Sequence, residues 1–339
     1  MSAFYPALAA DFARLLERLR GRKVAVVGHA RPDGDCIGSQ VGLARILAAA
    51  GYEVTCVNAD VVPRRLQFLV PGMTFVRTDA MVADAGDYAA VFVDSADHAR
   101  PGDRLKARFP APVGNIDHHL SNIGYAEINL VDSGSAATAE ILTGLAVDRG
   151  MTIDAQAAQA LFTGIVTDTG QFRFASTSQR TFLLAAELMA RGAQPPQVGT
   201  ELYERESVGK LTLLQHYLAS LKTECGGRVC VGTLAKGVFE STGTTAEDTE
   251  GLVDYARSVD GVDVGVLIEE RADGSVKASL RAKDAAYRLD LIAAEFNGGG
   301  HACAAGLNLK KDTDNFYPRL LAALARQIAV VDAQRKATP

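Results

Sequence analysis

The sequence predicts an α/β protein whose N-terminal part is a Rossmann-like parallel sheet. Over roughly the first 190 residues, short continuous runs of β-branched and other apolar residues alternate with segments of helical periodicity. Continuous apolar runs of this kind are typical of strands buried on both faces of a parallel sheet. Several of the runs end in Asp or His, and parallel sheets place ligand-binding groups at the carboxyl ends of their strands.

The first expected elements are a helix, a strand, a polar turn and a second helix. Residues 7–20 carry leucines and a phenylalanine at helical spacing, and residues 23–28 form the first apolar run. His29, Asp33 and Asp35 follow in the turn. A helix N-cap accounts for one aspartate, but not for the histidine and both acids together. We therefore expect a metal-binding turn in which Asp33 and Asp35 direct their carboxylates to different metal ions.

Two later apolar runs have the same design. Residues 89–93 end at Asp94, and the run at 111–116 ends at Asp117-His118-His119. Because an imidazole is costly to bury without polar partners, adjacent histidines behind an aspartate are not typical of a hydrophobic core. Carboxylates combined with imidazoles suit Mn²⁺ better than the thiolate-rich sets of structural zinc sites do. These residues predict a metal-dependent hydrolytic site.

The other elements of this half carry weaker signals. Asp168 follows a predicted helix and is a further candidate ligand, although an ordinary position at the end of a helix explains it equally well. Gly192 is a suitable residue to end the last helix of the half. We expect strands at 52–57 and, at the edge of the sheet, 122–131, and helices at 136–148, 155–166 and 181–191.

The sequence pattern changes after residue 192. The proline pair Pro195-Pro196 and the charged stretch 201–210 predict a linker helix over residues 193–226. We therefore expect a catalytic metal-binding domain (1–192), the linker helix (193–226) and a smaller mixed-sheet α/β domain (227–339), with the active site in the cleft between the two domains. The smaller domain is expected to contain strands 228–234, 262–268 and 275–281, a hairpin turn at 272–274, and helices 247–259, 290–296 and 317–331.

A glycine triplet stands beside a histidine in the second domain, as Gly298-Gly299-Gly300-His301. Backbone N–H groups without side chains in the way form a suitable cradle for a phosphate or a ribose. A flexible loop without function is the simpler explanation of the triplet taken alone. Arg281, at the end of a predicted strand, is either a second substrate contact or an ordinary solvated residue.

Composition limits the possible partners. The net charge of −5 argues against a broad grip on long DNA or RNA, so a nucleic-acid substrate is expected to be short. Five cysteines without a CxxC spacing are typical of reduced thiols in a cytoplasm. The first residues lack the features of a secretory signal, and no apolar run reaches the ~18 residues of a membrane span. We expect a cytoplasmic protein without membrane contacts, and the paired domains are compatible with a homodimer.

Four blocks of residues occur in the order found in the DHH phosphoesterase superfamily, and the chain resembles that family over nearly its whole length. They are His29-x-x-x-Asp33-x-Asp35-x-x-Gly38-Ser39, then Asp94, then Asp117-His118-His119, then Asp168. Residues 167–174, 202–204 and 298–306 resemble, more narrowly, the nano-RNases and pAp phosphatases of the NrnA type. This resemblance implies a DHH domain, a DHH-associated C-terminal domain, and two divalent metal ions, usually Mn²⁺.

The resemblance also implies a role for each matching residue. His29 and Asp33 match ligands of the first metal, Asp35, His118 and Asp168 match ligands of the second, and Asp94 matches the bridging ligand. His119 matches a histidine near the substrate phosphate, and Asp117 an aspartate that orients a histidine. Arg281 and the segment Gly298-Gly299-Gly300-His301 match substrate-binding positions. Ala282 and Asn297 stand where the family more often has Ser and Gly, which puts the fine substrate preference in doubt.

The implied reaction is metal-assisted attack of water on a phosphorus ester. The implied substrates are RNA of a few nucleotides, linear dinucleotides such as the cyclic-di-AMP product pApA, and 3′-phosphoadenosine 5′-phosphate. An inorganic pyrophosphatase and a longer-strand exonuclease are alternatives from the same superfamily. A non-catalytic nucleotide-sensing module is an alternative of another class, and loss of a ligand would be its signature. Every expected ligand type is present.

Overall fold

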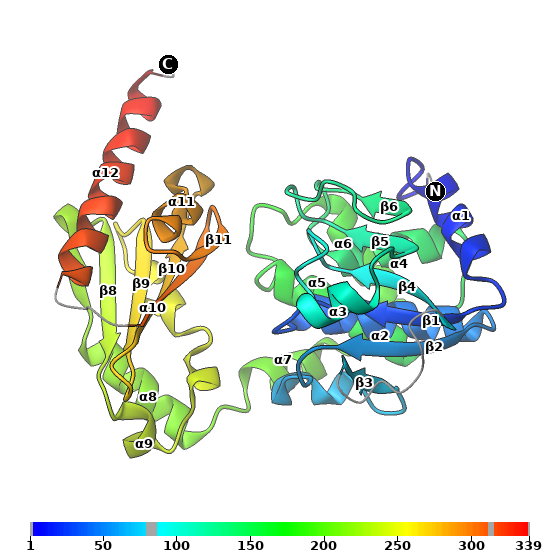
Figure 1. Cartoon of the computed structure of the whole chain (residues 1–339), viewed down its shortest axis with the longest axis horizontal. Helices are drawn as coiled ribbons and strands as arrows, with labels where there is room; N and C mark the ends of the chain where they lie inside the picture. Colours follow the sequence, from blue (N-terminus) through cyan, green and yellow to red (C-terminus); the bar gives the residue numbers. More distant parts are fainter. Residues whose placement is uncertain (1–2, 79–86, 311–314, 338–339) are drawn as a thin grey trace. The chain divides into compact units, whose positions relative to one another are not determined.

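The computed structural model describes residues 3–78, 87–310 and 315–337. The chain forms two units, Met1–Arg205 and Glu206–Pro339 (Figure 1). Each unit is built on its own six-stranded sheet. The predicted mixed α/β class, with a parallel sheet in the N-terminal part and a mixed sheet in the C-terminal part, is confirmed.

The sheet of the first unit is entirely parallel. Its strands are β1 (Lys23–Val27), β2 (Glu53–Asn58), β3 (Phe75–Arg77), β4 (Tyr88–Val93), β5 (Gly114–Asp117) and β6 (Ile128–Val131), in the order β3-β2-β1-β4-β5-β6. From β1 the chain continues outward to β2 and β3, then returns to β4 and continues in the other direction. The strand order therefore reverses between β1 and β4, and open α/β sheets bind ligands at such a switch point.

Helices cover both faces of this sheet. They are α1 (Ala9–Leu19), α2 (Gly34–Ala49), α3 (Asp103–Arg108), α4 (Thr138–Asp148), α5 (Ala155–Asp168), α6 (Gln179–Ala190) and α7 (Pro195–Tyr203), with the 3-10 helix η1 (Arg64–Leu69). The larger core packs α1, α2, α4, α5 and α6 against one face, and α3 contributes Leu105 to a smaller core on the other. Both cores are apolar because β1 and β4 are buried on both faces, as their continuous apolar runs predict.

The second unit has a mixed sheet with the order β11-β12-β10-β9-β8-β7. The strands are β7 (Lys222–Glu224), β8 (Val229–Leu234), β9 (Val264–Glu270), β10 (Val276–Ala282), β11 (Gly299–His301) and β12 (Ala304–Leu309). Only β8 and β9 pair in parallel among these neighbours, and β9 and β10 form the predicted hairpin. The helices are α8 (Val208–Ala219), α9 (Val238–Thr242), α10 (Leu252–Ser258), α11 (Leu289–Ala294) and α12 (Phe316–Ala337), with short 3-10 turns η4 (Cys225–Gly227), η5 (Ala246–Thr249) and η6 (Ala285–Tyr287).

Several segments differ from their expected form. Residues 193–226, expected to be one linker helix, contain α7, α8 and β7, and the two helices belong to different units. The predicted domain boundaries at 192 and 226 stay predictions. The helix expected at 247–259 is divided into η5 and α10, because Gly251 adopts a left-handed conformation with φ +84°.

The glycine triplet is not the flexible loop that the sequence suggested. Gly299–His301 forms the edge strand β11, which pairs with β12. Gly300 has φ +145°, and a Cβ at this position would lie 2.4 Å from the Ala304 carbonyl oxygen. The backbones can approach this closely only because residue 300 has no side chain.

Within the three described ranges of the chain, no helix is both long enough and apolar enough to cross a membrane.

Candidate metal centre

The switch point of the parallel sheet gathers the candidate ligands of the first unit. His29 follows β1, Asp94 follows β4, and His118 and His119 follow β5. Asp33 is the N-cap of α2 and Asp35 lies in its first turn. Asp168, the last residue of α5, completes the set. The structure therefore brings together every metal-site residue that we predicted in this unit.

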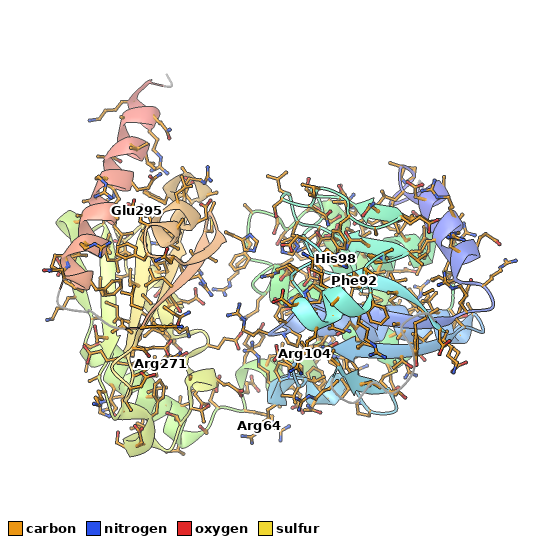
Figure 2. The ribbon with its side chains drawn as sticks, viewed as in Figure 1. Arg64, Phe92, His98, Arg104, Arg271 and Glu295 are labelled. Carbon is orange, nitrogen blue, oxygen red and sulfur yellow. The ribbon has the colours of Figure 1, made fainter. Side chains whose placement is uncertain are left out.

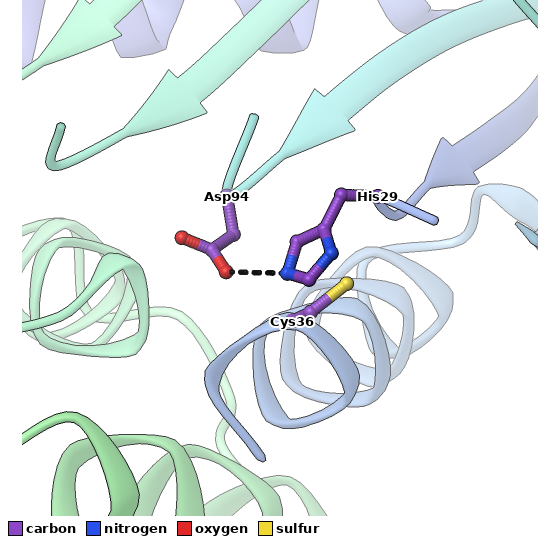
Figure 3. Close-up of side chains that lie close together, drawn as sticks. All are labelled: His29, Cys36 and Asp94. Carbon is purple, nitrogen blue, oxygen red and sulfur yellow. Dashed lines mark ion pairs between the residues drawn. The ribbon is translucent and has the colours of Figure 1, made fainter. Parts of the chain in front are cut away.

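His29 is buried with one ring nitrogen directed at carboxylates. Its Nδ1 donates to the carbonyl oxygen of Ala30 at 2.9 Å, so Nε2 is the nitrogen available for a ligand. Nε2 lies 3.3 Å from Oδ2 of Asp94 (Figure 3). It also lies 3.7 Å from Oδ1 of Asp33. It is a buried nitrogen without a hydrogen-bond partner. Burial lowers the pKa of His29, but the nearby Cys36 and the two carboxylates raise this pKa by more.

Asp94 is the most connected acid of the cluster. One oxygen, Oδ2, faces His29, while Oδ1 lies 3.6 Å from Nε2 of His118 and 3.7 Å from Nδ1 of His119. Burial would raise the pKa of its carboxyl, but the three imidazoles outweigh burial and hold the pKa well below its usual value. Its backbone has φ +53°, an unusual conformation for a residue other than glycine that is found most often where function requires it.

The side chain of Asp35, a residue of α2, extends to the N-terminus of α4. Its carboxylate is fully buried and accepts the backbone N–H groups of Thr138 and Ala139, at 2.7 and 2.9 Å. The positive end of the helix dipole is a favourable place for an anion. Burial and the like charges of Asp94 and Asp168 nevertheless raise the pKa of Asp35 well above its usual value.

His118 joins Asp94 to Asp168. Its Nδ1 contacts the carbonyl oxygen of Ser135 at 3.4 Å, and its Nε2 lies 3.1 Å from Oδ2 of Asp168. Burial lowers the pKa of His118, but Asp168 and the other carboxylates raise this pKa to about 11. Burial also raises the pKa of Asp168, although His118 opposes that effect. His118 is therefore held between two carboxylates, those of Asp94 and Asp168.

Asp117 supports His119 from behind. It is fully buried, and its Oδ1 accepts a hydrogen bond from Nδ1 of His119 at 2.7 Å. Its other oxygen accepts the side-chain amide of Asn122 at 2.6 Å. The rings of His118 and His119 meet edge to face, with centroids 4.6 Å apart. The two adjacent histidines therefore share Asp94 as a neighbour but have different hydrogen-bond partners, Ser135 for His118 and Asp117 for His119.

Among the residues that the structure describes, three groups of donor atoms could each hold a metal ion. Asp35, His118 and Asp168 form one group, Asp94, His118 and His119 a second, and His29, Cys36 and Asp94 a third; within each group the atoms lie within 4.8 Å of one another. These donors fit a divalent cation on two grounds. The set is rich in carboxylate and imidazole, and the buried Nε2 of His29 has acceptors but no donor opposite it.

Two contributors to this cluster were not predicted from the sequence. Cys36 lies beside His29 in the first turn of α2, where its thiol is buried (Figure 3). The segment from Ser135 to Ala139 contacts Asp35, Asp94 and His118. The sequence offered only a helix-start signal for this segment, because a backbone N–H or carbonyl contact leaves no mark in residue type.

The candidate substrate residues of the second unit lie on one face of its sheet. Arg281 pairs with Ala304, which pairs with His301 on the edge strand. Paired residues direct their side chains to the same face, so the small Ala304 lies between a guanidinium and an imidazole. Burial lowers the pKa of Arg281. Gly299 and Gly300 are exposed on β11, and Gly298 precedes that strand.

Two other histidines lie outside the metal cluster. His98 packs against Phe92 with ring centroids 5.4 Å apart, and its Nε2 bonds the carbonyl oxygen of Phe109 at 2.8 Å (Figure 2). His216 lines a hollow of about 410 Å³ in the second unit together with Ser220 and Lys236. Neither histidine joins the groups of metal-ligand donors found in the described ranges.

Two family models match this chain, each over a different part of it. A family model described as the DHH family, N-terminal domain, matches residues 23–165. A model described as the DHHA1 domain matches residues 213–330. The two matches fall within the first and the second unit respectively.

Curated relatives match over most of their length. The protein named bifunctional oligoribonuclease and PAP phosphatase NrnA of Thermus thermophilus is 34% identical over 93% of this chain and 93% of its own. The protein of the same name from Bacillus subtilis is 29% identical over 83% of this chain and 87% of its own. A solved exopolyphosphatase-related protein from Bacteroides fragilis has a TM-score of 0.85 at 24% identity, over 96% of this chain and 98% of its own, and so shares the fold.

Proposed function

We propose that this chain, which belongs to the DHH family and carries a DHHA1 domain, is a divalent-metal-dependent phosphoesterase that acts on small nucleotides. Its substrates would be short oligoribonucleotides, linear dinucleotides such as pApA, and 3′-phosphoadenosine 5′-phosphate. The observation that carries the proposal is the shared position of Asp94 between His29 on one side and His118 on the other. The names of the relatives support the substrate class.

The ligands divide into two sets around Asp94. His29 and Asp33 would hold one ion, and Asp35, His118 and Asp168 the other, with Asp94 shared. The distances from His29 to Asp33 and Asp94, and from His118 to Asp94 and Asp168, support this division. The mixture of carboxylates and imidazoles supports Mn²⁺ as the ion. When bound, such a pair of ions would activate the attacking water and neutralise charge on the phosphate.

Asp117 and His119 would act on the substrate phosphate. The hydrogen bond from His119 to Asp117 fixes the orientation of the imidazole and occupies Nδ1. The other ring nitrogen, Nε2, would contact a phosphate oxygen or transfer a proton as the ester bond breaks. Asn122 holds Asp117 in place from its other oxygen.

The second unit would bind the nucleotide. Arg281 and His301 flank Ala304 on one sheet face. Because the alanine side chain between them is small, a negatively charged group could contact both. A guanidinium is a strong phosphate ligand because it donates several hydrogen bonds in one plane. The exposed Gly299 and Gly300 allow a ligand to approach the backbone of the edge strand.

The test is hydrolysis of a substrate panel by the full-length protein with added Mn²⁺. The panel contains 3′-phosphoadenosine 5′-phosphate, pApA, a short RNA, a long RNA and pyrophosphate. We expect turnover of the first three and loss of that turnover after treatment with a chelator, with recovery when Mn²⁺ is restored. Turnover of pyrophosphate alone would contradict the proposal in favour of a pyrophosphatase, and a preference for long RNA would favour an exonuclease.

A further inference from the structure

The start of α4 contacts three of the six candidate metal ligands. Thr138 and Ala139 donate their backbone N–H groups to Asp35, and the carbonyl oxygen of Ser135 faces Nδ1 of His118. The Thr138 hydroxyl lies 3.2 Å from Oδ1 of Asp94. This short segment therefore contacts Asp35, Asp94 and His118 at once.

Thr138 differs from its neighbours because it uses both of its hydrogen-bond donors on ligands. Its N–H is 2.7 Å from Oδ2 of Asp35, and its Oγ1–H donates to Asp94. A threonine has one side-chain donor, and a carboxylate can only accept, so this hydroxyl proton is directed at Asp94. The Thr138 side chain is fully buried.

A separate network behind α4 fixes Thr138 in place. The buried Glu140 accepts the N–H of Ala136 at 3.0 Å, the guanidinium of Arg180 at 2.8 Å and the hydroxyl of Thr181 at 2.9 Å. Arg180 lies over the ring of Tyr5, at 4.4 Å from its centroid. The first turn of α4 is therefore anchored independently of the metal ligands, so its groups can orient them.

We propose that Thr138 is the positioning residue of the metal centre, and that its hydroxyl fixes the rotation of the Asp94 carboxylate so that each oxygen faces one set of ligands. Oδ2 faces His29 and Oδ1 faces His118, and a hydrogen bond to Oδ1 alone restrains the carboxylate in this arrangement. Because the same residue also holds Asp35, Thr138 links the shared ligand to a ligand of one set. This inference rests on the proposed function.

The test measures Mn²⁺ binding to the full-length, metal-free protein, from the paramagnetic resonance signal of free Mn²⁺ during a titration. Thr138→Val removes the hydroxyl at nearly constant size, and Thr138→Ser retains it. Loss of an outer contact to a ligand typically weakens metal binding by about 10- to 100-fold. We expect such a loss for both bound ions in Thr138→Val, because Asp94 is shared, and near-normal binding in Thr138→Ser.

Thr143→Val is the matched control. Thr143 is equally buried on the same helix, but its hydroxyl donates to the carbonyl oxygen of Ala139 and contacts no ligand. We expect this variant to bind Mn²⁺ like the unchanged protein. Circular dichroism checks the fold of each variant, and Thr138→Ala replaces Thr138→Val if the latter does not fold.

Three results would overturn the inference alone: normal binding in Thr138→Val, binding in Thr138→Ser as weak as in Thr138→Val, or equal weakening in Thr143→Val. The last two would assign the effect to helix packing instead of the hydroxyl. If the unchanged protein bound no Mn²⁺, the proposed function would fail together with this inference. The titration needs no substrate, so it separates these cases from an error in the substrate class.

Discussion

Oδ2 of Asp94 lies 3.3 Å from Nε2 of His29, across the point where the strand order of the parallel sheet reverses. The two residues are 65 positions apart in sequence, yet they follow neighbouring parallel strands, β1 and β4. Parallel pairing brings the carboxyl ends of both strands to the same edge of the sheet. The relationship therefore depends on strand order, which residue type alone does not give.

Replacing Asp94 with Ala should abolish hydrolysis of pApA and weaken Mn²⁺ binding. The shared position of the carboxylate means that both ligand sets lose a donor. Steady-state kinetics and a Mn²⁺ titration measure the two effects. Asp97→Ala is the control, because Asp97 is exposed and accepts the backbone N–H of Ala99 in its own turn. Activity of Asp94→Ala near that of the control would contradict the proposed mechanism.

Asp117 and His119 should behave as one catalytic unit. Asp117→Asn and His119→Gln are each expected to lower kcat by roughly 100-fold, the usual scale for loss of a positioned acid or base. The double variant should lose little more than either single one, because each substitution removes one member of the same hydrogen-bonded pair. His98→Gln serves as a control outside the cluster. Fully additive losses would show that the two residues act separately.

Arg281 and His301 should affect substrate binding more than the chemical step. Arg281→Ala and His301→Ala are expected to raise KM for pApA by about 10-fold or more, which corresponds to roughly 1.4 kcal/mol of binding free energy. Mn²⁺ binding should not change, because both residues lie in the second unit. Lys283→Ala, two residues beyond Arg281, tests whether any nearby positive charge gives the same effect. A loss of kcat at constant KM would contradict the binding role.

Asp154→Asn should lower thermal stability at neutral pH but not in strong acid. Hydrogen bonds from Arg45 hold the pKa of Asp154 below its usual value, and Asn preserves the cap of α5 while removing the charge. A lowered folded-state pKa gives stability that is complete above the unfolded value of about 3.9 and is lost as the pH falls through the folded value.

The carboxylate of Asp154 is 42% exposed, so the difference in the free energy of unfolding should stay below about 1 kcal/mol. Thermal unfolding of both proteins across the acid range measures it. A stability difference that persisted below both pKa values would show that the charge of Asp154 is not its source.

The parallel sheet was predictable because its central strands are buried on both faces. The runs at 23–28 and 89–93 correspond to β1 and β4 within one residue at each end, since only apolar residues are tolerated there. The three-residue strands β3 and β7 were not predicted, because they are too short to carry a pattern. The edge strand β11 was mistaken for a loop, because its glycines carry no side-chain signal and its partner β12 decides its conformation.

The sequence by itself determined which chemical groups this protein can offer. Its carboxylates and imidazoles, from His29 to Asp168, follow apolar runs or helices in a recognisable order, and that order is a property of the chain alone. Only the tertiary structure decided which of these groups meet. Strand order places Asp94 between His29 and His118. The backbone N–H and hydroxyl groups of Thr138 then donate hydrogen bonds to Asp35 and Asp94. Every residue except proline has such an N–H group, so residue type cannot reveal where it is used.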